Sequence, residues 1–362
     1  MEPRRQRQQP HRDPPALAPV PQVDYALENG FRPPWWLRNA HVQSILPSLP
    51  LRRALVTWRC ARIRTHSRPL ILECGEEVRL LAQHTPTTRP QPAGAVLMLH
   101  GWEGDANALY MLALARRLLA SGFEILRLNL RDHGGTQDLN AGLFHSCRLA
   151  EVTGAVRRAQ QLFAGLPLHL AGFSLGGNFL LRVAADAEQE GLDIASVVAI
   201  SPVLEPRATL AAIETAPGVY HDYFVRKWSN SLRAKQRAWP QLYRFDSIGG
   251  SASLRQMTAE LVARYTEFGS LDEYLDGYSI TRGRLAALSV PATIITAADD
   301  PIVPVADLQH VAAGTSLRAV VTRRGGHCGF LTGLTGDTWA EDAVVAHLTR
   351  QGLPSACASP RS

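Results

Sequence analysis

The sequence predicts an α/β fold with a doubly wound, mostly parallel sheet. Six short runs of apolar, β-branched residues each end in polar or glycine-rich letters, which is typical of buried parallel strands. Amphipathic helical patterns lie between these runs, and such alternation of strand and helix predicts helices on both faces of the sheet. The chain has 362 residues, of which 46% are hydrophobic, so it can bury a large core.

The predicted elements follow in order along the chain. Two apolar segments at residues 70–84 flank the letters CGEE, a spacing that predicts an antiparallel hairpin. The predicted parallel strands lie at residues 93–101, 123–131, 166–174, 195–202, 292–300 and 317–327. Residues 107–122 and 149–165 show clear helical periodicity. Each of these two patterns stops at a glycine, Gly122 and Gly165, as helices commonly do.

A long interval interrupts the alternation. About ninety residues separate the strand that ends at Pro202 from the strand that starts near Ala292, which exceeds ordinary connection lengths. An insertion after a strand in the middle of the sheet overhangs the carboxyl edge, where ligands bind in open α/β folds. We therefore expect a helical lid at about residues 205–285.

The expected lid is rich in aromatic and basic residues, and each group has two interpretations. Its aromatic side chains either line an acyl pocket or form a small satellite core, since aromatic burial needs no ligand. Its cations either approach an anionic headgroup or phosphate, or belong to a solvated helix face, which is the commoner role of such charge runs. The cations are Arg226, Lys227, Arg233, Lys235 and Arg237.

Much of the basic excess of the chain is concentrated at its N-terminus. The formal net charge is +6, and four arginines fall within the first dozen residues. Residues 1–22 combine Arg, Gln and Pro with hardly any apolar run, which predicts a disordered tail. We expect a solvated leader here, and contact with anionic lipid or RNA is the alternative. The folded domain is predicted at residues 23–350, followed by a flexible tail at 351–362.

Several classes of protein and site are not expected. No stretch approaches the ~18 uninterrupted apolar residues that a membrane span needs. We expect a cytoplasmic protein without a transmembrane segment or a nucleic-acid partner, and peripheral membrane contact stays open. Five cysteines without C-x-x-C spacing argue against disulfides and a zinc site, so we expect neither metal nor organic cofactor. Cys328 beside His327 does not predict thiol catalysis, since adjacent side chains diverge.

A single serine, Ser174, is surrounded by glycines in the stretch HLAGFSLGGNFLLR. An apolar run precedes it and a helical pattern follows, so Ser174 lies at a strand-to-helix turn. A turn this sharp needs nearly absent side chains two positions to either side, which Gly172 and Gly176 provide. In this context the G-x-S-x-G pattern predicts a nucleophile elbow.

A serine nucleophile needs a base, and the base needs an orienting carboxylate. The stretch AADDPIVP places Asp299 and Asp300 after one predicted strand, and RRGGHCGF places His327 after the next. The order Ser, Asp, His is that of the α/β-hydrolase fold, whose triad lies on loops at the carboxyl edge of the sheet. We predict a triad of Ser174, His327 and Asp300. Asp300 takes the first position of a D-x-x-V-P pattern, and Asp299 would cap or brace the loop.

The negative oxygen formed when an ester carbonyl is attacked also needs hydrogen-bond donors. In LMLHGWEGDAN, His100 and Gly101 end a strand and let the chain turn, so the backbone N–H of Trp102 can face the site. The N–H of Leu175, after the nucleophile, is the predicted second donor. We expect His100 to brace this turn rather than to carry a proton.

Seven stretches carry a resemblance to a known family. They are FRPPWWLRNAHVQSI, HGWEGDANALYML, NLRDHGGT, AGFSLGGNFLLR, YFVRKW, ADDPIVP and GGHCGF. Together they resemble the YheT-type α/β-hydrolase family over about residues 31–335, and PPWWLRNAHVQS and SLGGN are the more specific motifs. The resemblance implies Ser174, Asp300 and His327 as a catalytic triad and serine-hydrolase chemistry on acyl esters. Relatives include medium-chain phospholipases and acyltransferases that make ethyl esters.

The chain departs from this family in two respects. Its stretch NLRDHGGT stands where relatives more often have an Arg-Gly turn. We also do not expect this chain to have the N-terminal membrane anchor of some eukaryotic members. We therefore predict a serine hydrolase that cleaves carboxylic esters with short- to medium-chain acyl groups, acting on a small-molecule substrate through an acyl-enzyme. Acyl transfer to an alcohol differs only in whether water reaches the acyl-enzyme. A phospholipase-type activity and a silent site that only binds are further alternatives, since fold alone does not fix activity.

Overall fold

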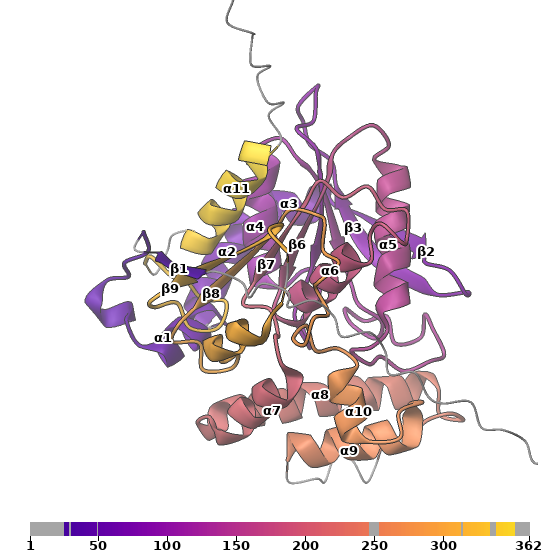
Figure 1. Cartoon of the computed structure of the whole chain (residues 1–362). Coiled ribbons are helices and arrows are strands. Elements are labelled where there is room, and N and C mark those ends of the chain that lie inside the picture. The colour runs from indigo at the N-terminus through magenta and orange to yellow at the C-terminus, as the bar shows by residue number, and fades with distance from the viewer. Residues whose placement is uncertain are drawn as a thin grey trace, which may run out of the picture.

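One mixed sheet organises the part of the chain that the computed structural model describes (Figure 1). The described residues are 25–28, 30–48, 50–245, 253–312, 314–333 and 338–351. Within them nine strands form a sheet of order β1-β9-β8-β7-β6-β4-β5-β3-β2. The strands are β1 (Tyr25–Glu28), β2 (Arg68–Glu73), β3 (Arg79–Thr85), β4 (Ala95–Leu99), β5 (Glu124–Leu128), β6 (Leu168–Phe173), β7 (Ser196–Ile200), β8 (Ala292–Ala297) and β9 (Leu317–Thr322).

The strand directions agree with the predicted fold class. β2 and β3 form an antiparallel hairpin, and β3 pairs antiparallel with β5, whereas the other neighbouring strands are parallel. Every residue of β4, β6, β7 and β8 is buried, which explains why their sequences are continuous apolar runs rather than alternating patterns. The doubly wound, mostly parallel sheet and its hairpin are thus confirmed. The sequence pattern does not predict β1, a four-residue strand that pairs with β9.

Helices cover both faces of the sheet and create two hydrophobic cores. They are α2 (Pro50–Arg59), α3 (Ala61–His66), α4 (Leu109–Ala120), α5 (Leu149–Leu162), α6 (Leu175–Ala185) and α11 (Trp339–Gln351). Side chains alternate across a strand, so the neighbours Val96 and Leu97 of β4 enter different cores. Val96 packs in the core that contains Met111 of α4, and Leu97 packs in the core that contains Phe179 of α6.

The interval between β7 and β8 is helical where the structure describes it. It contains α7 (Pro206–Thr215), α8 (Gly218–Ala238), α9 (Leu254–Tyr265) and α10 (Leu271–Asp276). Figure 1 shows these helices as one group below the sheet, apart from the helices that cover its faces. No described helix combines the length and the apolar character that a membrane span would require. The predicted tail at 1–22 lies outside the described residues, as does the tail at 351–362 apart from residue 351.

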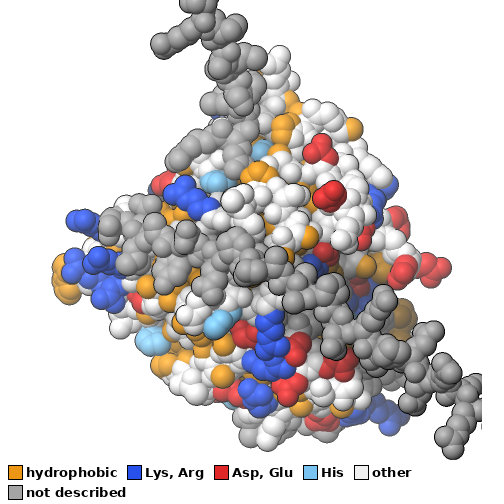
Figure 2. Space-filling view, in the orientation of Figure 1, with side chains coloured by type: hydrophobic (Ala, Val, Ile, Leu, Met, Phe, Trp, Pro, Cys, Tyr) orange, Lys and Arg blue, Asp and Glu red, His pale blue; other side chains and the backbone are white. Residues whose placement is uncertain are grey.

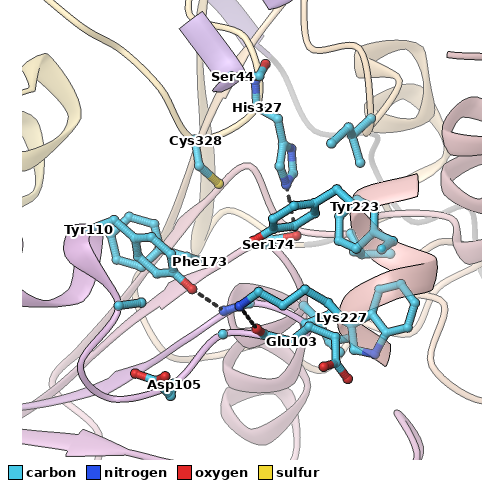
Figure 3. Close-up of a pocket in the computed structure, with 18 of the residues that line it drawn as sticks. Ser44, Glu103, Asp105, Tyr110, Phe173, Ser174, Tyr223, Lys227, His327 and Cys328 are labelled. Carbon is cyan, nitrogen blue, oxygen red and sulfur yellow. Dashed lines mark hydrogen bonds between the residues drawn. The ribbon is translucent and has the colours of Figure 1, made fainter. Parts of the chain in front are cut away.

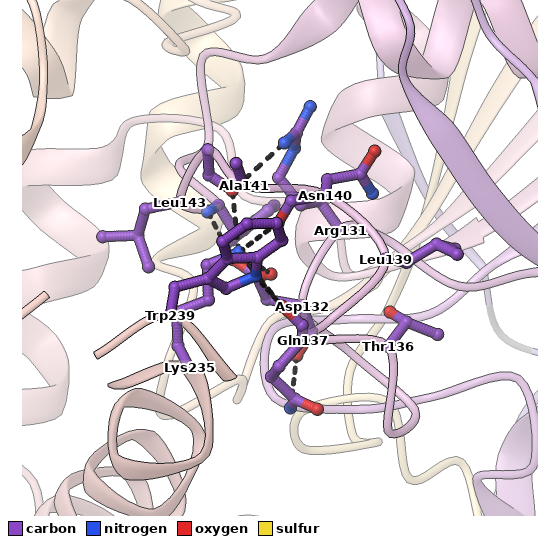
Figure 4. Close-up of polar contacts among 12 residues, drawn as sticks. Arg131, Asp132, Thr136, Gln137, Leu139, Asn140, Ala141, Leu143, Lys235 and Trp239 are labelled. Atoms are coloured by element: carbon purple, nitrogen blue, oxygen red, sulfur yellow. Dashed lines mark hydrogen bonds and ion pairs between the residues drawn. The ribbon is translucent and has the colours of Figure 1, made fainter. Parts of the chain in front are cut away.

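The burial of Lys235 contradicts the expectation that the basic residues of this segment form a solvated helix face. It lies on α8, yet its side chain is 0% exposed. Its Nζ donates to Asp132 Oδ1 at 2.8 Å and to the carbonyl oxygens of Asn140 at 2.6 Å and Gly142 at 3.0 Å (Figure 4). Because these acceptors belong to the loop that follows β5, Lys235 joins α8 to the body of the protein. The sequence places Lys235 in a basic run, but its partners are remote along the chain.

Candidate active site

Ser174 occupies the turn between β6 and α6 in a strained conformation. Its φ is +49° and its ψ is −119°, a region that residues other than glycine rarely adopt. A Cβ atom on Gly172 would lie 2.6 Å from the backbone nitrogen of Gly177, and a Cβ on Gly176 would lie 2.4 Å from the carbonyl oxygen of His100. Both glycines are therefore required by close backbone approach, which gives the turn the geometry of a nucleophile elbow.

His327 connects Ser174 to a buried carboxylate. Its Nε2 lies 3.0 Å from Ser174 Oγ, and its Nδ1 lies 2.9 Å from Asp300 Oδ2 (Figure 3 shows the serine contact). The Asp300 side chain is 0% exposed, and its Oδ1 accepts hydrogen bonds from the N–H groups of Ile302 and Val303. Since the carboxylate accepts the Nδ1 proton, Nε2 of the neutral ring is free to accept the serine proton.

The electrostatic environment makes His327 more basic than an ordinary histidine. Burial alone would lower the pKa of His327, but the Asp300 carboxylate, together with contacts to Cys328, holds that pKa well above its usual value of 6.5. The ring remains slightly accessible, with its side chain 13% exposed. A basic imidazole beside a hydroxyl is the arrangement that activates a serine nucleophile.

The neighbouring Asp299 takes a different place. Its Oδ1 accepts a hydrogen bond from the N–H of Gly326 at 3.0 Å, which connects the loop after β8 to the loop that carries His327. Its Oδ2 lies 3.9 Å from Arg324. Asp299 therefore braces the two loops, while Asp300 contacts the imidazole.

The two predicted oxyanion donors are the backbone N–H groups of Trp102 and Leu175. Trp102 and Leu175 both line the cavity at Ser174, and within the described part of the chain neither N–H has a hydrogen-bond acceptor. His100 is fully buried, and its Nε2 accepts the N–H of Leu130 while its Nδ1 donates to the carbonyl of Gly101. Burial lowers the pKa of His100 to about 3, so this ring stays neutral and braces the turn before Trp102.

A cavity of about 990 Å³ opens beside Ser174 and His327 (Figure 3). Part of its wall comes from α8, where Phe224 and Trp228 lie with their ring centroids 5.2 Å from that of Trp102. Further aromatic side chains in the wall are Tyr110, Phe144, Phe173, Tyr220, Tyr223, Tyr274 and Tyr278. The cavity is therefore suited to an apolar group attached to the carbonyl that Ser174 would attack.

The aromatic residues of the 205–285 interval divide between the two expected roles. Those of α8 and α10 named above line the cavity, whereas Tyr243, Phe245 and Tyr265 form a separate cluster with ring centroids 5.1 to 5.4 Å apart. The cations divide too: Lys227 lines the cavity and donates to the carbonyl of Glu103 at 3.2 Å, whereas Lys235 is buried elsewhere. The two expected roles of the aromatic residues thus apply to different residues, whereas Lys235 fits neither expected role of the cations.

A second pair of a histidine and a serine does not form an accessible site. His169 Nδ1 lies 2.8 Å from Ser196 Oγ, but both residues are 0% exposed within the sheet, so no substrate can reach them. Within the residues that the structure describes, no group of three or more His, Cys, Asp and Glu is placed to hold a metal ion.

Comparison with known proteins agrees with this architecture. A family model described as "alpha/beta hydrolase fold" matches residues 94–334. The chain belongs to the α/β-hydrolase family. It is 25% identical over 345 residues to "Putative esterase YheT" of Escherichia coli strain K12, which covers 90% of this chain and 95% of that protein. The YheT-type resemblance expected from the sequence is thereby confirmed.

Other similarities of this hydrolase are more distant. "Phospholipase ABHD3" of Mus musculus is 22% identical and covers 68% of this chain and 60% of that protein. The structure of esterase Pf2001 of Pyrococcus furiosus has a TM-score of 0.52 at 15% identity and covers 78% of this chain and 92% of that chain. A membrane phospholipase A described as a bacterial virulence factor has a TM-score of 0.52 at 15% identity, with coverages of 86% and 98%. At these identities, the two structures support the fold alone.

Sequence reasoning missed one group of contacts at the site of this hydrolase. The short helix α1 (Ala40–Ile45), which follows the 3₁₀ turn η1 (Trp35–Leu37), lies against the loop that carries His327. The motif NAHVQS, residues 39–44, contains this helix except for Ile45, and only the family resemblance indicates its importance. Nothing in its composition indicates a role at a site whose serine and histidine, Ser174 and His327, lie more than a hundred positions away.

Proposed function

We propose that this α/β hydrolase is a serine esterase that cleaves carboxylic esters through an acyl-enzyme. The observation that carries the proposal is the hydrogen-bonded chain from Ser174 Oγ through His327 to Asp300, with Ser174 and His327 in the wall of an aromatic-lined cavity. The raised pKa of His327 and the strained φ of Ser174 support the same assignment. Both are features of an activated serine rather than of a packed core.

The proposed reaction has two halves. Ser174 Oγ attacks the ester carbonyl while its proton passes to His327 Nε2, and Asp300 stabilises the imidazolium that forms. The N–H groups of Trp102 and Leu175 donate to the developing oxyanion, a contribution of about 2.7–4 kcal/mol for each donor. The imidazolium then protonates the departing alcohol. In the second half a water molecule loses a proton to His327 and attacks the acyl-enzyme. The imidazolium then returns this proton to Ser174 Oγ as the bond to the acyl group breaks and the acid is released.

The cavity favours an acyl group of short to medium length on a small-molecule ester. Its apolar wall includes Leu210, Ile213 and Leu261 from α7 and α9, in addition to the aromatic residues of α8. We assign α7 to α10 the role of a lid over this cavity, because they come from the interval between β7 and β8 and supply much of its wall. We also propose a cytoplasmic location, which the free thiols of Cys60, Cys74, Cys147 and Cys328 support.

A surface near the cavity supports peripheral contact with an anionic membrane. Residues 29–72 contain eight arginines and no Asp or Glu. Trp35 and Trp58 in this segment are 79% and 75% exposed, and Arg53 is one of its cavity-lining residues. Figure 2 shows a group of Lys and Arg side chains at the left edge of the molecule. Exposed tryptophan together with arginine is the combination that favours a bilayer interface with anionic lipid.

One experiment tests the central assignment. A fluorophosphonate probe is expected to label the wild-type protein at Ser174 and to leave the Ser174→Ala variant unlabelled. Nitrophenyl esters of increasing acyl length then give the chain-length preference, and added ethanol shows by the ratio of ethyl ester to acid whether water or alcohol resolves the acyl-enzyme. A folded wild-type protein that neither reacts with the probe nor hydrolyses any ester of the series would contradict the proposal.

A further inference from the structure

Helix α1 makes hydrogen bonds to His327 itself and to Leu331, four residues further along the same loop. Ser44 Oγ accepts the backbone N–H of His327 at 2.8 Å, and its own hydroxyl donates to the carbonyl of Ala40 at 2.8 Å. Gln43 is 0% exposed, and its side chain pairs with the backbone of Leu331. Its Oε1 accepts the Leu331 N–H at 2.7 Å, and its Nε2 donates to the Leu331 carbonyl at 3.2 Å.

The same helix packs directly against the glycines of this loop. A Cβ atom on Gly326 would lie 2.5 Å from the carbonyl oxygen of Ala40, and a Cβ on Gly329 would lie 2.2 Å from the carbonyl oxygen of Gln43. No side chain larger than hydrogen fits at either position. The glycines that flank His327 thus allow the backbone of α1 to approach the loop on each side of the imidazole.

The loop needs such support because its own conformation is strained. Residues 325, 326, 328 and 330 all have positive φ, and two of them, Cys328 and Phe330, are not glycine. Positive φ at residues other than glycine costs of the order of 1–3 kcal/mol each and persists only where the surroundings fix it. Gln43 and Ser44 supply three of the hydrogen bonds that fix this backbone.

Helix α1 is itself held in place at two points. The side chain of Asn39 caps its start by accepting the N–H groups of His41 and Val42 at 2.9 and 3.1 Å. The Nδ1 atom of His41 lies 3.1 Å from the hydroxyl of Tyr220 on α8. The helix therefore lies between the loop of His327 and a helix of the proposed lid.

We propose that Gln43 and Ser44 are positioning residues that set the distance between His327 and Ser174. This inference rests on the proposed function, since it takes His327 to be the base. It assigns a role to the stretch NAHVQS that neither the elbow nor the triad explains. Because a displacement of about 1 Å in a reacting group costs about 100-fold in rate, loss of these bonds lowers catalysis with little effect on substrate binding.

The test compares Ser44→Ala and Gln43→Ala with the wild type and with Ser121→Ala. Ser121 is a matched control, because its Oγ likewise donates to the carbonyl four residues earlier, Arg117, and among the described residues its hydroxyl makes no hydrogen bond to the loop of His327. For each protein the rate of fluorophosphonate labelling at Ser174, kcat, KM, the pH profile and the melting temperature are measured. If the variant at the buried Gln43 does not fold, Ser44→Ala alone still tests the proposal.

The expected result separates positioning from a loss of stability. At a temperature where the variants are folded, Ser44→Ala and Gln43→Ala lower kcat and the labelling rate by about 10- to 100-fold, with KM within about twofold. The acid limb of the pH profile also moves to lower pH. When the imidazole of His327 lies farther from the Asp300 carboxylate, its pKa is raised less. Ser121→Ala leaves kcat, the labelling rate and the pH profile unchanged.

Two outcomes would overturn the inference, and each is distinct from failure of the proposed function. If wild-type Ser174 is labelled and both variants react at the wild-type rate, α1 has no positioning role. If the variants lose only melting temperature and keep kcat and the pH profile, their contacts are structural. Absence of labelling in the wild type itself would instead reject the serine mechanism on which the inference depends.

Discussion

The ammonium group of Lys235 lies 2.8 Å from the Asp132 carboxylate in the interior of the protein. Two buried charges 103 residues apart are thereby paired, and the remaining protons of Lys235 are directed at backbone carbonyls of the same loop. Removing a charge from water costs several kcal/mol, so such a pair is tolerated only when both partners and the extra acceptors are present. The pair therefore fixes α8, which supplies part of the cavity wall, to the loop after β5.

Replacing Lys235 by methionine is expected to destabilise the protein. The substitution leaves Asp132 buried without its cation, a change that lowers the free energy of unfolding by about 3–5 kcal/mol. Arg237→Met, which removes an exposed cation two positions later on the same helix, is the control and is expected to change it by less than about 0.5 kcal/mol. Urea denaturation measures both. Equal stability of the two variants would show that the buried pair contributes nothing.

The sequence predicts features whose residues lie close together along the chain. It does not predict contacts between residues that are far apart in sequence. The strand-to-helix turn at Ser174 could be predicted because its glycines and its nucleophile lie within five residues. The loops of Asp300 and His327 each follow an apolar run, so their common edge could be predicted as well. Lys235 and Gln43 could not, because their partners lie about a hundred and nearly three hundred residues away. Their burial depends on tertiary packing, which the hydrophobic periodicity of the sequence does not indicate.

The two aspartates of the AADD stretch should differ in their effect on turnover. Asp300→Asn removes the carboxylate that orients His327 and is expected to lower kcat by about 10⁴-fold. Asp299→Asn removes only the acceptor of the Gly326 N–H, so most of the activity should remain. Steady-state kinetics on a nitrophenyl ester measures both variants. The assignment is wrong if Asp299→Asn abolishes activity while Asp300→Asn retains it.

A methyl group at Gly176 should disrupt the nucleophile elbow. The new Cβ would lie 2.4 Å from the carbonyl oxygen of His100 and 2.5 Å from that of Leu99, so the backbone must move. We expect Gly176→Ala to lower the free energy of unfolding by about 1–3 kcal/mol and to reduce kcat. Gly218→Ala, at the start of α8 and with no atom within 4 Å of the added Cβ, is expected to be neutral or to stabilise by up to about 1 kcal/mol. Thermal unfolding and activity assays of the pair test this contrast.

The activity should rise with pH through an unusually high midpoint. His327 must be neutral to accept the proton of Ser174, and it is protonated at pH values below its pKa. Since that pKa is raised well above 6.5, the acid limb of kcat/KM is expected to have its midpoint above 6.5. A profile measured between pH 5 and 9 on the wild-type enzyme checks the sign. A midpoint below 6.5 would mean that burial, rather than Asp300, dominates the pKa of His327.

Binding to vesicles should depend on anionic lipid. The segment at residues 29–72 is entirely cationic in its charged side chains, so the full chain is expected to sediment with phosphatidylglycerol vesicles and not with phosphatidylcholine vesicles. Added salt should weaken the interaction, because it screens exposed charges. Vesicles titrated at low and high salt give the comparison.

Two variants and a truncation localise the contact. Arg53→Gln removes one exposed cation at the cavity and is expected to weaken binding about fivefold, as one cation near a charged surface contributes about 1 kcal/mol. Arg237→Gln on α8 is the matched control and should leave the affinity unchanged. Because the basic residues before position 23 would also attract anionic lipid, the same titrations are repeated with residues 1–22 deleted. If that deletion alone abolishes binding, the attraction belongs to the N-terminal tail, and the surface around Trp58 and Arg53 does not dock on the membrane.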